Sequence, residues 1–384
     1  MKRALLVGLV ACGSSSTTPP PAVDAVAAPP DAPVAIAPLR VTSLGVQGFA
    51  LSYGDDVVLT APMFTRQSAI LVGLNAPLDS DTAAVDAGLA GVSLDNLRAV
   101  VSGHAHYDHL LDVPYILTKA PNASVFANRT AKHILAALAP DRPACTTPAP
   151  MTIARARVVA MDEPNASYVD WTNCPSLKPG GAPLDGTWVT APGGRVRMKA
   201  VCSMHPDQLG PIHFGEGAID QDLCELPNAA ADWLEGATLA FVIDFLDASG
   251  RPAYRVFYQD APTDPPVGHV PAALLAEHPI DLALLCVGTY DAVADHPGAI
   301  VANLAPRYAI SGHWEDFFQA ASEPPQPIPL LDLPRYLAAA EAALPGVPDG
   351  PFLVDGALTT SRHVLAQPGM QVAIPYSSPS RANR

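Results

Sequence analysis

A short segment, residues 101–109 (VSGHAHYDH), contains three histidines and one aspartate within six consecutive positions. Neutral imidazole and carboxylate are the groups that Zn²⁺ and similar divalent ions prefer as ligands. In an extended or tightly turning segment, residues two apart point the same way. We therefore expect His104 and His106 to bind one ion, and Asp108 and His109 to bind a second ion beyond the bend. A polar loop with chance histidines is the alternative interpretation.

The histidine segment follows an apolar run, residues 97–101 (LRAVV), which has the character of a β-strand. With HxHxDH at the end of a strand, the sequence resembles the metallo-β-lactamase superfamily, and the resemblance extends over roughly residues 40–320. It implies an α/β fold that is a four-layer αββα sandwich. In such a fold two β-sheets face each other, helices cover their outer faces, and a dinuclear metal site lies at one edge.

The rest of the chain has the elements that one large domain of this kind needs. Its 384 residues are 49% hydrophobic and 15% charged, which is enough for a sizeable core. We expect the domain to cover residues 39–350, with an irregular insertion at about 140–194 and a C-terminal extension over 351–384. Predicted strands cover residues 40–44, 48–53, 57–60, 97–101, 124–127, 195–201, 237–245, 253–260 and 282–287.

The resemblance implies three further metal ligands, each at the end of a predicted strand or shortly after it. His205 is the candidate third ligand of the first ion, with His213 as its alternative. Asp260 is the candidate that bridges the two ions; a turn-capping role and Asp244 are the alternatives. His313, in a Gly-His pair, is the candidate last ligand of the second ion.

The complete predicted ligand set has seven members: His104, His106 and His205 at one ion, Asp108, His109 and His313 at the other, and Asp260 between them. The four motif residues, His104, His106, Asp108 and His109, are also the predicted catalytic group. In the family the third strand usually ends in an aspartate that orients a metal-binding histidine. Ala61 stands at that position here, so this orienting group is missing.

Such a centre predicts hydrolysis, because two divalent ions about 3.5–4 Å apart lower the pKa of a water that they share. We expect a hydrolase that uses metal-bound hydroxide on an ester, lactone or phosphodiester. The ligand set suits Zn²⁺, with Mn²⁺ or iron as alternatives. Two other classes stay open: an iron-dependent redox enzyme of the same fold, and a non-catalytic binding lipoprotein.

The amino-terminal residues have the pattern of an export signal. Lys2 and Arg3 precede an apolar stretch that ends at Cys12, and the sequence LVAC at 9–12 resembles a bacterial lipobox. The resemblance implies a signal peptide over 1–11 and a lipidated Cys12; an ordinary secretory signal with a chance cysteine is the alternative. Residues 12–38, rich in Pro, Ser and Ala, are expected to form a tether.

These signals predict an exported lipoprotein, on the periplasmic face of the outer membrane or elsewhere in the cell envelope. The lipid anchor would attach it to a membrane, and the substrate would be a small or lipid-like molecule. The net charge of −15 argues against nucleic acid as a partner, because no basic block is present to replace phosphate counterions.

An exported protein can form disulfides. Besides Cys12, the sequence has five cysteines. We expect Cys145 to pair with Cys174 and Cys202 with Cys224, because each pair flanks an irregular region. Cys286 lies in an apolar strand pattern and is expected to be a buried free thiol.

Overall fold

The computed structural model describes residues 36–149, 151–163, 185–208, 210 and 212–376. The predicted signal peptide, Cys12 and nearly all of the predicted tether lie outside these residues. In the described part of the chain, no helix combines the length and the apolar character that are needed to span a membrane.

Sheet 1 has nine strands within the described residues, in the order β14-β13-β16-β1-β2-β3-β4-β5-β6. The first three strands of the chain pair antiparallel, and β3, β4, β5 and β6 pair parallel. The strands are β1 (Leu39–Gly45), β2 (Gly48–Tyr53), β3 (Asp56–Thr60), β4 (Leu97–Val101), β5 (Ser124–Ala127), β6 (Val158–Ala160), β13 (Leu353–Val354), β14 (Ala357–Leu358) and β16 (Gln371–Ile374).

Sheet 2 has seven strands within the described residues, in the order β15-β12-β11-β10-β9-β8-β7. They are β7 (Val189–Thr190), β8 (Val196–Cys202), β9 (Leu239–Leu246), β10 (Pro252–Gln259), β11 (Leu282–Cys286), β12 (Tyr308–Gly312) and β15 (His363–Leu365). Strand β11 ends in Cys286, which is a buried free thiol as predicted.

The α-helices of the described residues are mostly short. They are α1 (Ala69–Gly73), α2 (Thr82–Gly88), α3 (Tyr107–Leu110), α4 (Val113–Lys119), α5 (Arg129–Leu135), α6 (Ala272–Glu277), α7 (Gly298–Leu304) and α8 (Leu333–Ala343). Helix α5 begins at Arg129 because the side chain of Asn128 accepts a hydrogen bond from the backbone N–H of Ala131 at 2.8 Å.

Strand β9 shows why the central strands are apolar on both faces. Leu239, Phe241 and Ile243 belong to the core between the two sheets, whereas Ala240 and Val242 belong to the cluster under the outer helices. Successive side chains of a strand point to opposite faces. A strand that is covered on both faces therefore reads as a continuous apolar run.

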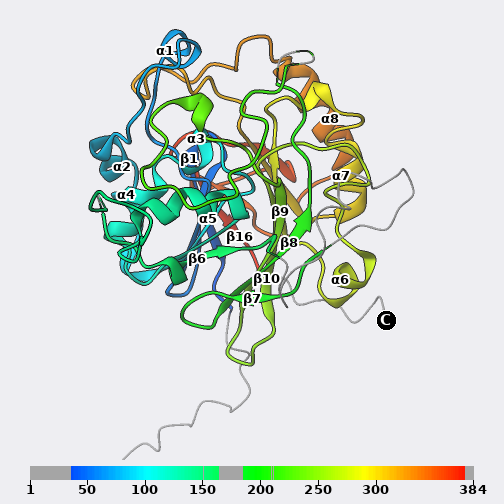
Figure 1. The fold of residues 1–384 in the computed structure, drawn as a ribbon. Helices are drawn as coiled ribbons and strands as arrows, with labels where there is room; N and C mark the ends of the chain where they lie inside the picture. The colour runs from blue at the N-terminus through cyan, green and yellow to red at the C-terminus, as the bar shows by residue number, and fades with distance from the viewer. Residues whose placement is uncertain (1–35, 150, 164–184, 209, 211, 377–384) are drawn as a thin grey trace, which may run out of the picture. The chain divides into compact units, whose positions relative to one another are not determined.

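Helices cover the outer face of each sheet, with α2, α4 and α5 on one side and α6, α7 and α8 on the other (Figure 1). On sheet 1, Leu59 shares an apolar cluster with Ile116 of α4 and Ile134 of α5. On sheet 2, Val242 shares another cluster with Leu274 of α6. The predicted four-layer αββα sandwich is confirmed.

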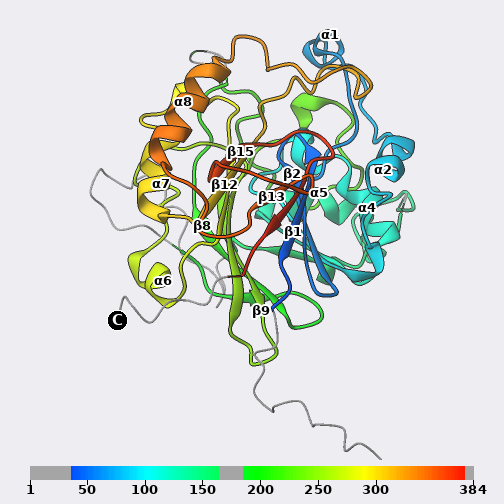
Figure 2. The same cartoon turned by 180° about the vertical axis from the view of Figure 1, so that it is seen from behind.

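Both sheets continue past residue 350, where the sequence suggested an extension of the domain. Strand β16 pairs with β1, with Leu39 opposite Ile374 at one end and Thr42 opposite Gln371 at the other. Strand β15 pairs with β12. Figure 2 shows these red C-terminal strands beside the blue β1 and the yellow β12. The last described strands therefore complete the sandwich.

The structure corrects both predicted disulfides. Cys145 is bonded to Cys224, which excludes the predicted pairs Cys145–Cys174 and Cys202–Cys224. Cys202 is also disulfide-bonded, and its partner lies outside the described residues. The pairing follows from contacts between distant loops, since Arg142 donates a hydrogen bond to the backbone oxygen of Cys224 at 2.5 Å.

Candidate metal centre

The predicted ligands follow the ends of four strands that meet at one edge of the sandwich. Strands β8 and β10 are both antiparallel to β9, and β10, β11 and β12 are parallel, so the carboxyl ends of β8, β10 and β12 share an edge. His205, Asp260 and His313 follow these three ends. The end of β4 is joined to this edge, because the N–H of Leu239 donates to the backbone oxygen of Gly103 at 2.8 Å.

The first-ion group, His104, His106 and His205, is brought together with its ligand atoms within 4.8 Å of one another. The ring of His104 lies 4.6 Å from that of His106 and 4.8 Å from that of His205, measured between centroids. The Nδ1 atom of His205 donates to the backbone oxygen of Pro206 at 2.7 Å. This bond leaves the Nε2 atom of His205 as the nitrogen with a free lone pair.

In the second-ion group, His109 and His313 both contact Asp108, and the ligand atoms that lie within 4.8 Å of one another are those of His104, Asp108 and His109. The Oδ2 atom of Asp108 lies 3.2 Å from Nε2 of His109 and 3.3 Å from Nε2 of His313. Asp108 and His109 are on α3, and His313 follows β12 with a left-handed φ of 57°. Its N–H donates to the backbone oxygen of Val46 at 2.6 Å, which holds this unusual conformation in place.

Asp260 lies on the Nδ1 side of two histidine rings. Its Oδ1 atom accepts a hydrogen bond from Nδ1 of His104 at 3.1 Å, and its Oδ2 atom accepts one from the N–H of Gly103 at 2.6 Å. The Nδ1 atom of His109 is 3.7 Å from Oδ2. Asp260 therefore orients His104 with Nε2 directed away from the carboxylate. The structure thus shows an orienting contact of Asp260 with His104, and the bridging role that the sequence suggested stays a prediction.

This contact bears on the missing aspartate of β3. Ala61 follows β3 as expected and is buried, and its N–H donates to the backbone oxygen of Val101 at 2.7 Å. It offers no side-chain oxygen. The carboxylate that orients His104 comes from Asp260 instead.

Asp244, the alternative to Asp260, is not part of this cluster. Its carboxylate is fully buried and pairs with Arg255 at 2.7 Å and with Arg197 at 2.8 Å. A carboxylate that is held by two guanidinium groups has no free oxygen for a metal ion.

The two groups fit divalent ions in distance and chemistry. Ligands about 2.0–2.1 Å from a tetrahedral ion stand about 3.4 Å apart, which is close to the 3.2 and 3.3 Å around Asp108 Oδ2. The Nε2 atom of His104 is buried and has no hydrogen-bond partner among the described residues. A buried polar atom without a partner costs free energy, and an ion would remove that cost.

Burial also sets the charge states that metal ligands require. It lowers the pKa of His106 and of His205 to about 3, and neighbouring histidines add to the effect, so both rings are neutral near pH 7. Burial alone would raise the pKa of Asp108, but His109 and His313 outweigh it and hold that pKa well below its usual range. The group is therefore a carboxylate.

Two residues next to the first-ion group were not in the predicted set. The ring of His213 lies 5.4 Å from that of His205, and its Nε2 atom contacts a carboxylate oxygen of Glu235. These two residues and His205 form a third group whose ligand atoms lie within 4.8 Å of one another. His213 had entered only as an alternative to His205, and no spacing signal in the sequence pointed to Glu235.

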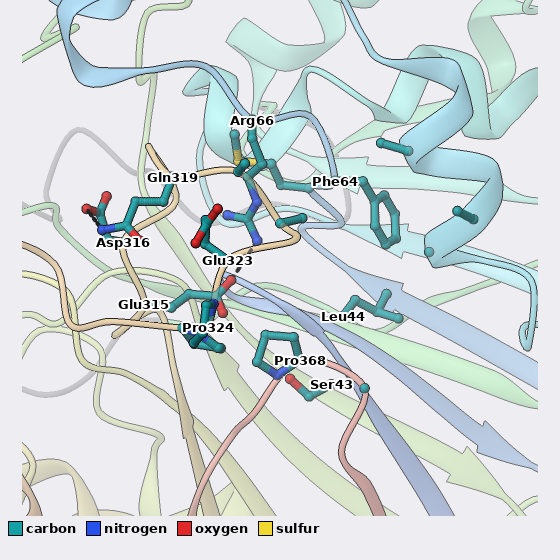
Figure 3. Close-up of a pocket in the computed structure, with 18 of the residues that line it drawn as sticks. Ser43, Leu44, Phe64, Arg66, Glu315, Asp316, Gln319, Glu323, Pro324 and Pro368 are labelled. Atoms are coloured by element: carbon teal, nitrogen blue, oxygen red, sulfur yellow. Dashed lines mark hydrogen bonds and ion pairs between the residues drawn. The ribbon is translucent and has the colours of Figure 1, made fainter.

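A cavity of about 430 Å³ opens beside the segment that follows His313 (Figure 3). Arg66 extends into it and binds Glu315 at 2.7 Å, and Glu315 also accepts a hydrogen bond from the N–H of Val46 at 2.8 Å. Val46 is the residue whose backbone oxygen holds His313. The cavity wall is thus linked to the second-ion group, and its other lining residues include Leu44, Met63, Phe64, Pro324 and Pro368.

The architecture consists of two facing sheets with helices outside both. The histidine motif lies where the end of β4 meets the edge of sheet 2. This is the αββα architecture that the resemblance to the metallo-β-lactamase superfamily implied. No protein-family model matches the chain, and no curated protein matches it.

Several solved structures are similar to the chain at low sequence identity. The metallo-beta-lactamase fold protein YhfI from Bacillus subtilis is 12% identical, with a TM-score of 0.43 over 87% of this chain and 98% of that one. Igni18, a metallo hydrolase from Ignicoccus hospitalis, is 12% identical with a TM-score of 0.44, and the match covers 88% of this chain and 100% of that one. CmlA, a diiron beta-hydroxylase from Streptomyces venezuelae, is 9% identical with a TM-score of 0.39, and the match covers 82% of this chain and 51% of that one.

Proposed function

We propose that this chain is a metal-dependent hydrolase with a dinuclear centre, and that it acts on an amphiphilic ester, lactone or phosphodiester. The observation that carries the proposal is the convergence of the first-ion and second-ion groups. Asp108 Oδ2 lies 3.2 and 3.3 Å from two imidazole nitrogens, which is the spacing of ligands around one small ion. Two such groups share the edge of the sandwich, with the ring of His104 4.3 Å from that of His109.

When bound, two divalent ions supply an activated water and positive charge for the oxygen that becomes negative during hydrolysis. The chain supplies the geometry. Asp260 fixes the ring of His104, Pro206 fixes the ring of His205, and the His313 backbone is held by Val46. Side chains that are locked by such outer partners keep the ligands in place without reorganisation during the reaction.

Apolar side chains near the first-ion group support an amphiphilic substrate. Met204, Ile212 and Phe214 flank His205 and His213 in the sequence, and they are 40%, 47% and 56% exposed. Large apolar side chains that gather on one loop beside a polar site are typical of a surface that binds an apolar ligand. We propose that they contact the acyl or alkyl part of the substrate.

The predicted lipid anchor at Cys12 would place this enzyme at the cell envelope, where lipid-like esters and phosphodiesters occur. Labelling with a radioactive or alkyne fatty acid tests this part. Label in the wild type and none in Cys12→Ser is the expected result, and equal label in both proteins would contradict the anchor.

Metal content and turnover test the proposed function together. The full chain would be purified under mild conditions, analysed for metals, and assayed with a phosphodiester, a lactone and an ester that each release a chromophore. About two Zn²⁺ ions per chain with turnover of one substrate class is the expected result. Two iron ions without hydrolysis, or no metal even after reconstitution, would contradict it.

Phe214→Ser tests the apolar contact. Losing about half of the burial of an aromatic side chain corresponds to roughly 1 kcal/mol, or about a fivefold increase of KM for a long-chain substrate. The KM for a short-chain substrate should stay the same. Leu358→Ser is the matched control, because Leu358 is 71% exposed on β14, the outermost strand of sheet 1. An equal change for both chain lengths would argue against the contact.

A further inference from the structure

His205, His213 and Glu235, here called the outer triad, form a second cluster next to the first-ion group. Their ligand atoms lie within 4.8 Å of one another. The cluster is nearer to solvent, because the side chain of His213 is 17% exposed and that of its neighbour Asp207 is 47% exposed, whereas His104 is fully buried. An ion that moves from solvent to His104 on this side of the site would meet the outer triad first.

Each member of the outer triad has one polar atom held by an outer partner. Nδ1 of His205 donates to Pro206, Nδ1 of His213 lies 3.4 Å from a carboxylate oxygen of Asp207, and Oε1 of Glu235 accepts from the hydroxyl of Thr238 at 2.7 Å. The atoms that face one another are Nε2 of both histidines and Oε2 of Glu235, and Nε2 of His213 contacts that Oε2 atom. Histidines that bind a metal typically have their other nitrogen held by a carboxylate or a carbonyl in this way.

Glu235 is also fixed to the segment that carries the motif. Its N–H donates to the backbone oxygen of Gly215 at 2.8 Å, and its backbone oxygen accepts from the N–H of Ala105 at 2.9 Å and from the amide of Asn128 at 2.7 Å. The residue is 9% exposed. Its two carboxylate oxygens are partnered by the hydroxyl of Thr238 and by Nε2 of His213. An ion held by the triad would replace the contact between His213 and Glu235 and would compensate the charge of the carboxylate.

We propose that the outer triad binds a divalent ion of the zinc type and serves as an entry position for the first ion. Two imidazoles and one carboxylate match the ligands that Zn²⁺ and Co²⁺ accept. This inference rests on the proposed metal centre.

His205 belongs to both groups, and one imidazole nitrogen binds one ion. The outer triad and the complete first-ion group are therefore not filled at the same time. An ion at the outer triad reaches the first-ion group by keeping His205 and exchanging His213 and Glu235 for His104 and His106. The transfer is an exchange of ligands around one divalent ion, so it needs no oxidant and no reductant.

Counting ions in variants tests the outer triad independently of turnover. His104→Asn removes Nε2 and retains a donor for Asp260, so it disables the first-ion group with a small structural change. The full chain, stripped with a chelator, would be titrated with Zn²⁺ alone against a coloured chelator, and bound Zn²⁺ would be measured after desalting. Thermal unfolding checks that each variant folds; His106→Asn replaces His104→Asn if the latter does not.

We expect about two ions in the wild type and about two in His104→Asn, because the outer triad holds an ion there. Adding Glu235→Gln to His104→Asn should lower the number to about one. Adding Glu216→Gln instead should leave it at about two, because Glu216 is exposed and lies on the same loop. About one ion in His104→Asn alone, or two in the variant with Glu235→Gln, would overturn the inference.

The outcomes separate this inference from the proposed function. A wild type that takes up no Zn²⁺ contradicts the proposed function itself, whereas two ions in the wild type and one in His104→Asn contradict only the outer triad. Stopped-flow uptake tests the entry role. Glu235→Gln in the otherwise wild-type chain should slow uptake of one ion about tenfold or more, with uptake by Glu216→Gln unchanged. Equal rates would overturn the entry role.

Discussion

The two ion groups of this centre are built in different ways. The second-ion group sits on α3 and directly after β12, and the backbone of His313 is bonded to the turn between β1 and β2. The first-ion group takes His205 from a long loop between β8 and β9, whose only helix among the described residues is a short 3₁₀ helix at Ala230–Asp232. The second-ion group is therefore fixed by the sandwich, whereas the first-ion group depends on loop contacts for its third ligand, His205.

The largest effect should come from the site that the sandwich fixes. Asp108→Ala removes the carboxylate that lies between His109 and His313. We expect the loss of one ion per chain and a decrease in kcat/KM of roughly 10³-fold or more, because ligands that act as a unit cannot replace one another. Elemental analysis and initial rates measure both. Asp86→Asn, at an exposed carboxylate on α2, is the control. Two tightly bound ions in Asp108→Ala would contradict the assignment.

A smaller effect should come from loosening the loop. Replacing Cys145 and Cys224 with alanine removes a cross-link between residues 79 apart, and we expect the free energy of unfolding to fall by about 2–4 kcal/mol. Affinity for one ion should fall while the other is unchanged, because Cys224 lies in the loop that carries His205. Urea titration and Zn²⁺ competition are the measurements. Cys286→Ala is the control, since it removes a buried thiol without a cross-link. An equal loss of affinity for both ions would contradict the view that only the first-ion group depends on the loop.

The same division separates what the sequence could predict from what it could not. The motif residues, His205, Asp260 and His313 all follow strands with clear apolar patterns, and the resemblance to a known family implied that these residues would meet. The choice of Asp260 over Asp244 also agrees with the structure, which pairs Asp244 with two arginines.

The loop could not be predicted in this way. Glu235 reaches the centre through backbone bonds to Gly215 and Ala105, and these contacts have no periodic signal in the sequence. The Cys145–Cys224 bond likewise depends on two loops that meet only in the folded chain. Strands β13 to β16 have only two to four residues each, too few for an alternating pattern to appear above chance.

Asp260→Asn sharpens the comparison because Asp260 contacts a histidine of each group. If the carboxylate orients His104, the variant should still bind two ions, with affinity for the first-ion group about 10–100-fold weaker. If Asp260 instead bridges the ions, as the sequence suggested, the variant should lose an ion. Zn²⁺ competition distinguishes these results, and cobalt absorption spectra of the wild type and the variant report the change in coordination.

The smallest effect should come from the wall of the cavity. Glu315 accepts hydrogen bonds from Arg66 and from Val46, and Gly45 next to it leaves room for the carboxylate, because a Cβ there would lie 2.7 Å from Oε1. Glu315→Gln keeps an acceptor but removes the charge opposite Arg66. We expect the free energy of unfolding to fall by about 1 kcal/mol.

The same variant should lower the affinity for the second ion about threefold, because Val46 holds the backbone of His313. A change of less than 1 kcal/mol in the free energy of that contact corresponds to such a loss. The first ion should be unaffected. Glu323→Gln is the matched control, because Glu323 lines the same cavity but is exposed. A larger loss at the first ion than at the second would show that the cavity wall supports the loop, and that the two groups are not fixed independently.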